Sequence, residues 1–328
     1  MIIAKVPLRI SFFGGGTDIP SFYKKNNYGC VLNTTVNKFL FITIKNHGDL
    51  FYEKFRLNYS ISEIANQTNE IKNKIFKEII RKFSVKEKLY LSTISDVPAS
   101  SGLGSSSALV VGLFLLFNKK YKCQMKKFEI VEEAAQFEIK EISNFIGKQD
   151  HYSSFYGGMN YFEFHKNEKV KRIKIKNLNF IKQIEKKLIF FWTGIQRDAN
   201  RILEKQDNNL HRNSENLIKM RNITIEVLRR IKNNMIDYKI FGEFLDESWI
   251  LKKKLSSVIS DDHINNCYEI AKKNGAIGGK LLGAGGGGFL MLLAPQISHK
   301  KIIFKLQKKN LIHEKIKFFD NGPSLISF

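Results

Sequence analysis

The sequence has 328 residues, of which 43% are hydrophobic and 26% are charged. This length suggests two domains, and the apolar content is sufficient for real cores, which excludes a disordered chain. No stretch reaches the roughly 18–20 apolar residues that cross a bilayer, and the N-terminus lacks the layout of a signal peptide. We therefore expect a soluble, cytoplasmic protein without a membrane partner.

The 54 basic and 31 acidic residues give a net charge of +23. Clustered basic residues would suggest nucleic-acid binding. Here the lysines are scattered along the chain, with short runs on helix faces such as Lys252–Lys254, and no nucleic-acid-binding module is recognisable. We expect no nucleic-acid partner, although a positive field would help to attract an anionic substrate. The three cysteines lie far apart and have no metal-binding spacing.

Hydrophobic periodicity predicts alternating strands and helices in chain order. In the first half, strands are expected at 2–13, 30–45, 88–94, 159–164 and 170–175, and helices at 62–83, 105–117 and 128–142. In the second half, strands are expected at 188–192, 289–293 and 315–319, and helices at 197–234, 241–255, 262–274 and 300–309. No linker composition marks the boundary, which we place near 176–187, dividing the chain into domains 1–180 and 181–328.

A loop of small residues joins the strand at 88–94 to the apolar helix at 105–117. Glycines let the backbone approach a ligand, and a helix N-terminus directs unpaired N–H groups at an anion. A capped turn alone would not need six small residues in the seven positions 101–107. The loop therefore predicts phosphate binding by Pro98, Ser101, Gly102, Leu103, Gly104, Ser105, Ser106 and Ser107. The Walker and protein-kinase sequences are absent, which disfavours those two classes.

Two further glycine clusters follow other patterns. The segment 283–288 formally satisfies GxGxxG, but a strand follows it rather than a helix, so a dinucleotide-binding fold is disfavoured. It is either a flexible hairpin turn or a close approach of the backbone to a ligand or another loop. The segment 14–18 follows Arg9 and ends in Thr17 and Asp18, which either bind hydroxyl groups or form an ordinary turn.

Two carboxylates, Glu138 and Asp150, complete the candidate chemistry. Phosphoryl transfer needs one carboxylate that orients the attacking hydroxyl and another that binds Mg²⁺. Taken as isolated residues, both are interpreted as surface carboxylates. His151 is interpreted as a packing or solvent-facing residue because no Ser or Cys nucleophile pattern accompanies it.

In this order, the segments at 6–18, 98–108 and 280–288 resemble the three motifs of the GHMP kinases. The resemblance covers nearly the whole chain, from near residue 4 to near residue 293. It implies an α+β fold with an N-terminal ribosomal-protein-S5-like domain and a C-terminal ferredoxin-like α/β domain, with the active site in the cleft between them. It also implies ATP and Mg²⁺ as cofactors.

The resemblance also implies a role for each matched residue. Asp150 would orient, or accept a proton from, the anomeric hydroxyl of a sugar, and Arg9 would lower that hydroxyl's pKa or stabilise the transferring phosphoryl group. Glu138 would bind Mg²⁺ together with Ser106 or Ser107, and the amides of 102–107 would hold the β- and γ-phosphates. The remaining substrate-binding candidates are Gly16, Thr17 and Asp18 for sugar hydroxyls, Gly285 and Gly286 in the third motif, and Lys148 and Arg197 for a distal phosphate.

Within the family, the segments at 9–18, 147–152, 156–158 and 193–203 are similar to the kinases of D-glycero-D-manno-heptose 7-phosphate. The sequence departs from them at 145–147, where Pro-Gly-Gly is usual, and at His151, where Gln is common. The expected partners are ATP and a sugar phosphate, and the expected state is a monomer or homodimer. The expected product is the 1,7-bisphosphate used for nucleotide-activated heptose and surface polysaccharide. The alternatives are a fucokinase- or galactokinase-like enzyme, a catalytically silent sugar or nucleotide sensor, and a basic nucleic-acid-binding protein.

Overall fold

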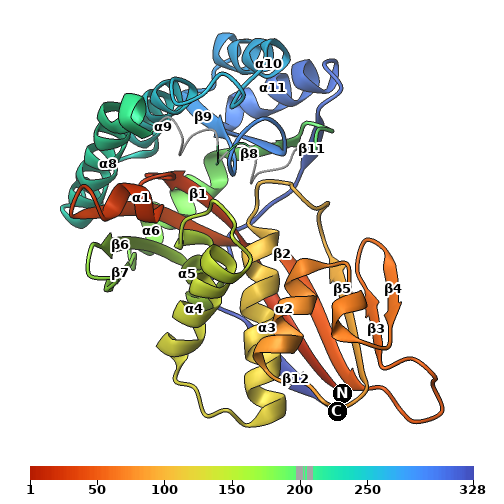
Figure 1. The fold of residues 1–328 in the computed structure, drawn as a ribbon. Coiled ribbons are helices and arrows are strands. Elements are labelled where there is room, and N and C mark those ends of the chain that lie inside the picture. The colour runs from red at the N-terminus through yellow and green to blue at the C-terminus, as the bar shows by residue number, and fades with distance from the viewer. Residues whose placement is uncertain (197–201, 203, 205–209) are drawn as a thin grey trace.

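Two β-sheets organise the chain in the computed structural model, which describes residues 1–196, 202, 204 and 210–328 (Figure 1). The first sheet has eight strands in the order β12-β1-β2-β5-β3-β4, with β6 paired to β2 and β7 paired to β6. Its strands are β1 (Ile2–Phe13), β2 (Tyr28–Asn46), β3 (Phe55–Asn58), β4 (Ser62–Ala65), β5 (Leu89–Ser95), β6 (Met159–His165), β7 (Val170–Lys174) and β12 (Ser324–Ser327).

The second sheet has four antiparallel strands in the order β11-β8-β10-β9. These are β8 (Leu188–Trp192), β9 (Gly278–Leu281), β10 (Phe289–Leu293) and β11 (Ile312–Glu314). The helices are α1 (Pro20–Tyr23), α2 (Lys74–Lys82), α3 (Ser105–Tyr121), α4 (Lys127–Gln136), α5 (Gln149–Tyr156), α6 (Leu178–Lys187), α8 (Leu210–Lys232), α9 (Tyr238–Lys253), α10 (Asp262–Lys273) and α11 (Gln296–Gln307), with short helical turns at Thr68–Glu70 and Phe137–Glu141. No helix in the described part of the chain is both long and apolar enough to cross a membrane.

Strands β1 and β2 form the spine of the first sheet. Along its 19 residues, β2 pairs with β1 on one edge and with β6 and then β5 on the other. The register between β1 and β2 shifts on each side of Arg9, between Pro7 and Arg9 and again between Ser11 and Phe13. Such bulges redirect side chains, and they are common beside active sites.

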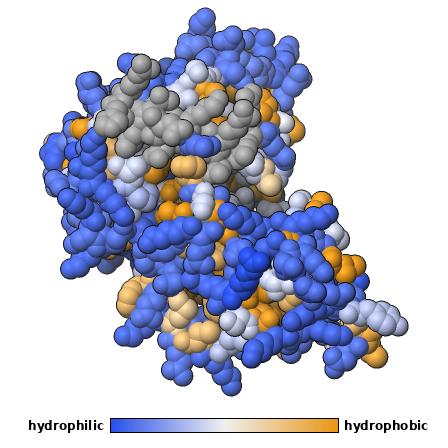
Figure 2. Space-filling model, in the orientation of Figure 1, coloured by the Kyte–Doolittle hydropathy of each residue, from blue (hydrophilic) through white to orange (hydrophobic). Residues whose placement is uncertain are grey.

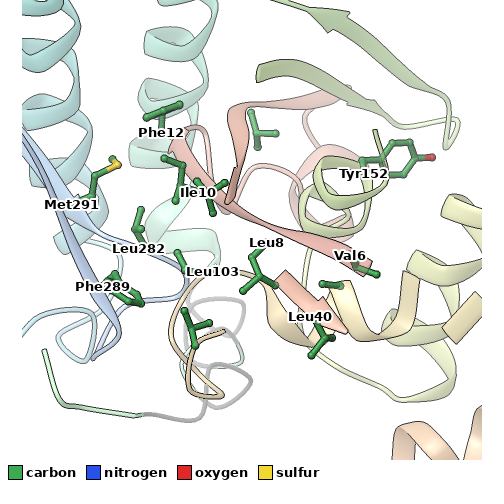
Figure 3. Packing of buried hydrophobic residues seen from close by; sticks show 14 of the residues in the cluster. Val6, Leu8, Ile10, Phe12, Leu40, Leu103, Tyr152, Leu282, Phe289 and Met291 are labelled. Atoms are coloured by element: carbon green, nitrogen blue, oxygen red, sulfur yellow. The ribbon is translucent and has the colours of Figure 1, made fainter. Parts of the chain in front are cut away.

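Helix α3 packs against β1 and β2 and is apolar on nearly all sides because it lies inside the first domain. The helix comes close to β2 at Gly112, where a Cβ atom would lie 2.3 Å from Ile42 Cδ1. The apolar core continues from this sheet to the second one, as the labelled side chains Leu8, Leu103 and Leu282 show (Figure 3). Hydrophilic residues cover most of the face shown in Figure 2, and hydrophobic ones form scattered patches between them.

The predicted helix at 62–83 is wrong over its first half. Residues Ser62–Ala65 form strand β4, which pairs with β3, and α2 begins only at Lys74. The isoleucine spacing suggested one helical face, but Ile64 is 62% exposed, whereas Glu63 is 9% exposed. The Glu63 carboxylate accepts hydrogen bonds from the amides of Lys72 and Asn73 and so holds a turn before α2.

The strand predicted at 315–319 is also misplaced, because the strand of the second sheet is Ile312–Glu314. The chain then leaves that sheet, and β12 pairs with residues Ile2–Lys5 of β1. The domain division at residue 180 stays a prediction. Because β12 pairs with β1, the last strand of the chain belongs to the first sheet. Part of the predicted helix 197–234 lies outside the described residues, and its remainder is α8.

Candidate active site

The small-residue loop between β5 and α3 is held by its own buried residues. Leu103 is fully buried between Leu8 and Leu282 (Figure 3), and its carbonyl accepts a hydrogen bond from the Arg9 amide at 3.0 Å. Gly102 and Gly104 have φ values of 83° and 77°, which favour glycine because a Cβ atom is strained there. This conformation brings the N-terminus of α3 to the wall of a cavity.

That cavity has a volume of about 330 Å³ and is lined by residues from both halves of the chain. Of the residues predicted to bind phosphate, Gly102, Gly104, Ser105, Ser106 and Ser107 line it, whereas Pro98, Ser101 and Leu103 do not. Ser101 and Leu103 anchor the loop instead: the Ser101 carbonyl accepts a hydrogen bond from the Phe289 amide at 3.1 Å. A helix N-terminus without intrahelical partners for its first amides attracts an anion.

The glycine-rich segment at 283–288 packs against this loop, backbone to backbone. A Cβ atom at Gly102 would lie 2.7 Å from the Leu282 carbonyl oxygen, and one at Gly288 would lie 2.4 Å from the Ser101 carbonyl oxygen. The glycines therefore serve close approach to another loop, one of the two interpretations left open by the sequence. Gly285 lines the cavity, and the Gly286 amide donates to the Ile259 carbonyl.

Arg9 and Asp150 form a bidentate pair inside the cavity. Arg9 Nε donates to Asp150 Oδ1 at 2.6 Å, and Nη2 donates to Oδ2. Arg9 Nη1 donates to the Gly102 carbonyl at 2.6 Å. The side chains are 5% and 22% exposed, so the more accessible partner is the carboxylate. A carboxylate has about four lone-pair sites, so both oxygens can accept a further hydrogen bond from a substrate hydroxyl.

Asp18 lies on the same cavity wall and is held by Gln149. Its Oδ1 accepts from Gln149 Nε2 at 2.9 Å, and its Oδ2 accepts from the Gln149 amide at 3.1 Å. Gln149 also accepts a hydrogen bond from Ser11. Burial, followed by the nearby charge of Asp150, raises the pKa of Asp18 to about 6.

Of its two neighbours in the motif, Gly16 lines the cavity and Thr17 does not. The Thr17 hydroxyl is buried, accepts from the Cys30 amide at 3.0 Å, and lies within hydrogen-bonding distance of the Gly14 and Cys30 carbonyls. Thr17 therefore shapes the turn that presents Asp18.

Glu138 is fully buried at the other side of the phosphate loop and still reaches the cavity. Its Oε1 accepts from Ser106 Oγ at 2.5 Å, and its Oε2 lies 2.7 Å from His151 Nε2. Burial acts to raise the pKa of Glu138, but the hydrogen bonds from His151 and the serines outweigh it, so the pKa lies below its usual value. His151 is thus neither a mere packing residue nor exposed to solvent: it is a partner of this carboxylate.

The pair Glu138 and Ser106 fits a magnesium ion by the chemistry of its donors. Mg²⁺ prefers oxygen ligands and is typically held by one or two carboxylates together with substrate phosphates. The described residues contain no cluster of three or more Asp, Glu, His or Cys side chains that would hold a metal by themselves. A single carboxylate and a serine hydroxyl beside a phosphate-binding loop agree with an ion that is shared with the nucleotide.

Of the two residues suggested for a distal phosphate, Lys148 does not line the cavity. Lys148 is 1% exposed, and its ammonium forms ion pairs with Glu132 at 2.5 Å and Glu168 at 2.7 Å. Arg197 lies outside the described residues. Among the described residues, the cations that line the cavity are Arg9, Lys252 and Lys280.

The sequence patterns do not identify Lys252 as a cavity residue. They also do not identify Gln149 and His151, which bind the carboxylates of Asp18 and Glu138. Lys252 was assigned to a helix face as part of a lysine run, yet it is 6% exposed and turned inward. Its spacing in α9, three residues after Trp249 and seven after Leu245, places it on the buried face of the helix and is a usable signal. No local signal links His151 to Glu138.

Comparison with known proteins identifies the family of the chain. The N-terminal domain of the GHMP kinases matches residues 69–158, and their C-terminal domain matches residues 224–312. D-glycero-alpha-D-manno-heptose 7-phosphate kinase from Campylobacter jejuni is 30% identical, over 98% of this chain and 97% of its own length. The chain belongs to the GHMP kinase family.

Solved structures show the same fold from end to end. A D-glycero-D-manno-heptose 1-phosphate kinase from Bacteroides thetaiotaomicron superimposes with a TM-score of 0.79 at 22% identity, over 100% of this chain and 99% of its own. A putative sugar kinase from Campylobacter jejuni superimposes with a TM-score of 0.68 at 26% identity, over 99% and 98%. The predicted two-domain GHMP-kinase fold is confirmed, and ATP is the phosphate donor of this family.

Proposed function

We propose that this GHMP kinase transfers the γ-phosphoryl group of ATP to the anomeric C1 hydroxyl of D-glycero-D-manno-heptose 7-phosphate. The observation that carries the proposal is the Arg9–Asp150 pair, which lies beside the phosphate loop and leaves the carboxylate the more accessible partner. The choice of sugar rests on the heptose 7-phosphate kinase that is 30% identical over nearly the whole chain. Because ATP is the donor, we expect the enzyme to work in the cytoplasm. We also propose that it is a monomer or a homodimer.

In the reaction, a bond forms between the C1 oxygen and the γ-phosphorus, and the bond from that phosphorus to the β–γ bridging oxygen breaks. Asp150 accepts the hydroxyl proton and aligns the oxygen for attack, as expected of a carboxylate within hydrogen-bonding reach of the hydroxyl. Arg9 holds Asp150 in place through two hydrogen bonds and adds positive charge beside the transferring group. Asp18, Gly16 and Gln149 would bind the remaining sugar hydroxyls.

The phosphate loop supplies positioning and charge neutralisation. The first amides of α3 would bind the β- and γ-phosphates through the helix N-terminus. Glu138 and Ser106 would hold Mg²⁺, which when bound neutralises negative charge on the phosphates. His151 fixes the Glu138 carboxylate from behind, at 2.7 Å.

The proposal is tested by ADP release over a panel of sugars and by one substitution. With ATP and Mg²⁺, heptose 7-phosphate should support the highest kcat/KM, well above unphosphorylated heptose, galactose and fucose. Asp150→Asn should lower kcat by about 10²–10⁴-fold, which is the usual contribution of a positioned base, while the Kd for ATP stays nearly unchanged. The matched control is Asp320→Asn, which neutralises a carboxylate that is 69% exposed and outside the cavity.

Two outcomes would overturn the proposal. An Asp150→Asn enzyme with wild-type kcat would exclude Asp150 as the group that accepts the hydroxyl proton. Preference for an unphosphorylated sugar would instead favour a galactokinase- or fucokinase-like enzyme, and ATP binding without turnover on any sugar would favour a sensor.

A further inference from the structure

Two buried lysines face the cavity from the second domain. Lys252 comes from α9 and is 6% exposed, and Lys280 comes from β9 and is 3% exposed. Both line the cavity that holds Arg9, Asp150 and the phosphate loop. The roles derived above for the proposed reaction use neither of them.

The hydrogen bonds of both ammonium groups go to backbone carbonyls. Lys252 Nζ donates to the carbonyls of Leu281 at 3.3 Å and Gly283 at 2.5 Å, and Lys280 Nζ donates to the Phe12 carbonyl at 3.1 Å. Within the described ranges, neither lysine forms an ion pair with a carboxylate. The carboxylates that line the same cavity, Asp18, Glu138 and Asp150, have other partners, and Asp150 is bound by Arg9 on both of its oxygens. An ammonium has three donors, so these bonds leave capacity for a ligand.

A buried cation without a counter-charge is costly, and here three cations share one cavity. Burial, then the charges of Lys280 and Arg9, holds the pKa of Lys252 well below its ordinary value. Burial, then Arg9, lowers the pKa of Lys280 to about 7. A bound anion would remove this penalty by pairing with both groups. The charged form of both lysines is therefore disfavoured in the free protein, and a negatively charged substrate would favour it.

The position of the pair indicates which anion. Lys252 binds the Gly283 carbonyl, and a Cβ atom at Gly283 would lie 2.7 Å from Gly102 Cα in the phosphate loop. The pair therefore lies close to the phosphate loop, on the side of the cavity formed by the glycine-rich turn. Phosphate oxygens bind ammonium groups through charge-assisted hydrogen bonds.

We propose that Lys252 and Lys280 together bind a phosphate group of the substrates, on the wall of the cavity formed by the second domain. This inference rests on the proposed function. That phosphate is either the one already carried by the sugar or the phosphoryl group in transfer from ATP. Both present the same anionic oxygens, and the kinetic constants of two substitutions distinguish them.

The substitutions are Lys252→Met and Lys280→Met, which keep the length of the side chain and remove its charge. Lys254→Met is the matched control, because it removes the same charge from an exposed position two residues along from Lys252. The first measurement is binding of inorganic phosphate by calorimetry at constant ionic strength. Each cavity substitution should weaken phosphate binding by about tenfold or more, which corresponds to about 1.4 kcal/mol, whereas the control should not.

Steady-state kinetics then identify the source of the phosphate. If the pair binds the sugar's own phosphate, the KM for heptose 7-phosphate should rise by about tenfold while kcat and the KM for ATP stay close to wild type. If the pair binds the group in transfer, kcat should fall by about tenfold with both KM values little changed. Lys252→Arg and Lys280→Arg keep the charge and should retain phosphate binding. If the arginine variants bind phosphate and the methionine variants do not, the loss comes from the missing charge and not from misfolding.

The inference is overturned if both methionine variants are folded and match Lys254→Met in phosphate affinity and in all kinetic constants. Its failure is separable from failure of the proposed function. Should no sugar support turnover in the wild-type protein, the phosphate titration still decides whether the lysine pair is an anion site.

Discussion

Lys280 shows how a single buried charge couples stability to pH. Its pKa falls from the usual 10.5 to about 7 because burial, and then Arg9, disfavours the charged form. The unfolded chain therefore keeps this proton up to about pH 10.5, whereas the folded protein releases it near pH 7. Between these values the unfolded state binds more protons, so the free energy of unfolding rises with pH across this window. Below about pH 7 the lysine is protonated in both states, so the free-energy cost of burying its charge is present in full.

Replacing Lys280 should consequently stabilise the folded protein near neutral pH. Lys280→Met is expected to raise the free energy of unfolding at pH 7 by about 1–3 kcal/mol, after allowance for the lost hydrogen bond to the Phe12 carbonyl. The gain should shrink towards pH 10. Urea unfolding at pH 7 and pH 9.5 measures it, with Lys254→Met as an exposed control that should change little at either pH. A variant that is less stable than the wild type at both values contradicts this account.

At the scale of elements, the site depends on two loops that touch through their backbones. The loop before α3 and the turn before β10 come so close that side chains are excluded on both sides, at Gly102, Gly283 and Gly288. Arg9 adds a third connection through the Gly102 carbonyl. The phosphate-binding conformation is therefore a property of the contact between the loops and of the glycines that permit it.

Alanine substitution separates this contact from the strain of a positive φ. Gly102→Ala combines φ of 83° with a Cβ atom 2.7 Å from the Leu282 carbonyl oxygen. Gly194→Ala has φ of 76°, and its Cβ atom would have no heavy atom of the described residues within 4 Å. Gly194→Ala should cost about 1 kcal/mol of stability and leave the ATP affinity unchanged. Gly102→Ala should cost about 1–3 kcal/mol more and weaken ATP binding by about tenfold or more. Urea unfolding and calorimetry with ATP measure the two effects, and equal behaviour of the variants would refute the role of the contact.

At the scale of the whole molecule, the two ends of the chain pair with each other at one edge of the first sheet. Strand β12 pairs with β1, and Met1 and Phe328 exchange two hydrogen bonds, from the Met1 amine to the Phe328 carbonyl at 3.2 Å and from the Phe328 amide to the Met1 carbonyl at 3.0 Å. Figure 1 shows N and C side by side, far from the second sheet. The chain thus returns to its first domain after completing its second.

A circular permutant should therefore fold and remain active. Joining Phe328 to Met1 through a short Gly-Ser linker and opening the chain at Gln124, in the loop between α3 and α4, is expected to keep kcat/KM within about threefold of wild type, because the new ends lie in an exposed loop. Opening the chain instead between Val36 and Asn37, inside β2, should prevent folding. Circular dichroism and the ADP-release assay provide the comparison. An unfolded Gln124 permutant would contradict the arrangement of the ends.

The sequence alone determined the elements whose cause is local. The strand at 2–13, the helix that begins at Ser105 and the strand at 289–293 follow from hydrophobic periodicity, and all three are confirmed. The three glycine-rich motifs and their order predicted the family, because tight turns and helix N-termini require those residues at those spacings. The helix predicted at 62–83 failed where a buried carboxylate, Glu63, overrode periodicity.

Only the tertiary structure decided which charges are available to a ligand. Lys148 is the candidate phosphate ligand by sequence, yet Glu132 and Glu168 neutralise it. Lys252 belongs to a lysine run, yet it faces the cavity without a carboxylate partner among the described residues. Likewise, Arg9 forms its hydrogen bonds with Asp150, which lies 141 residues later in the sequence. The physical reason is that burial and pairing depend on contacts between distant segments, and no local pattern of side chains encodes which distant segment will arrive.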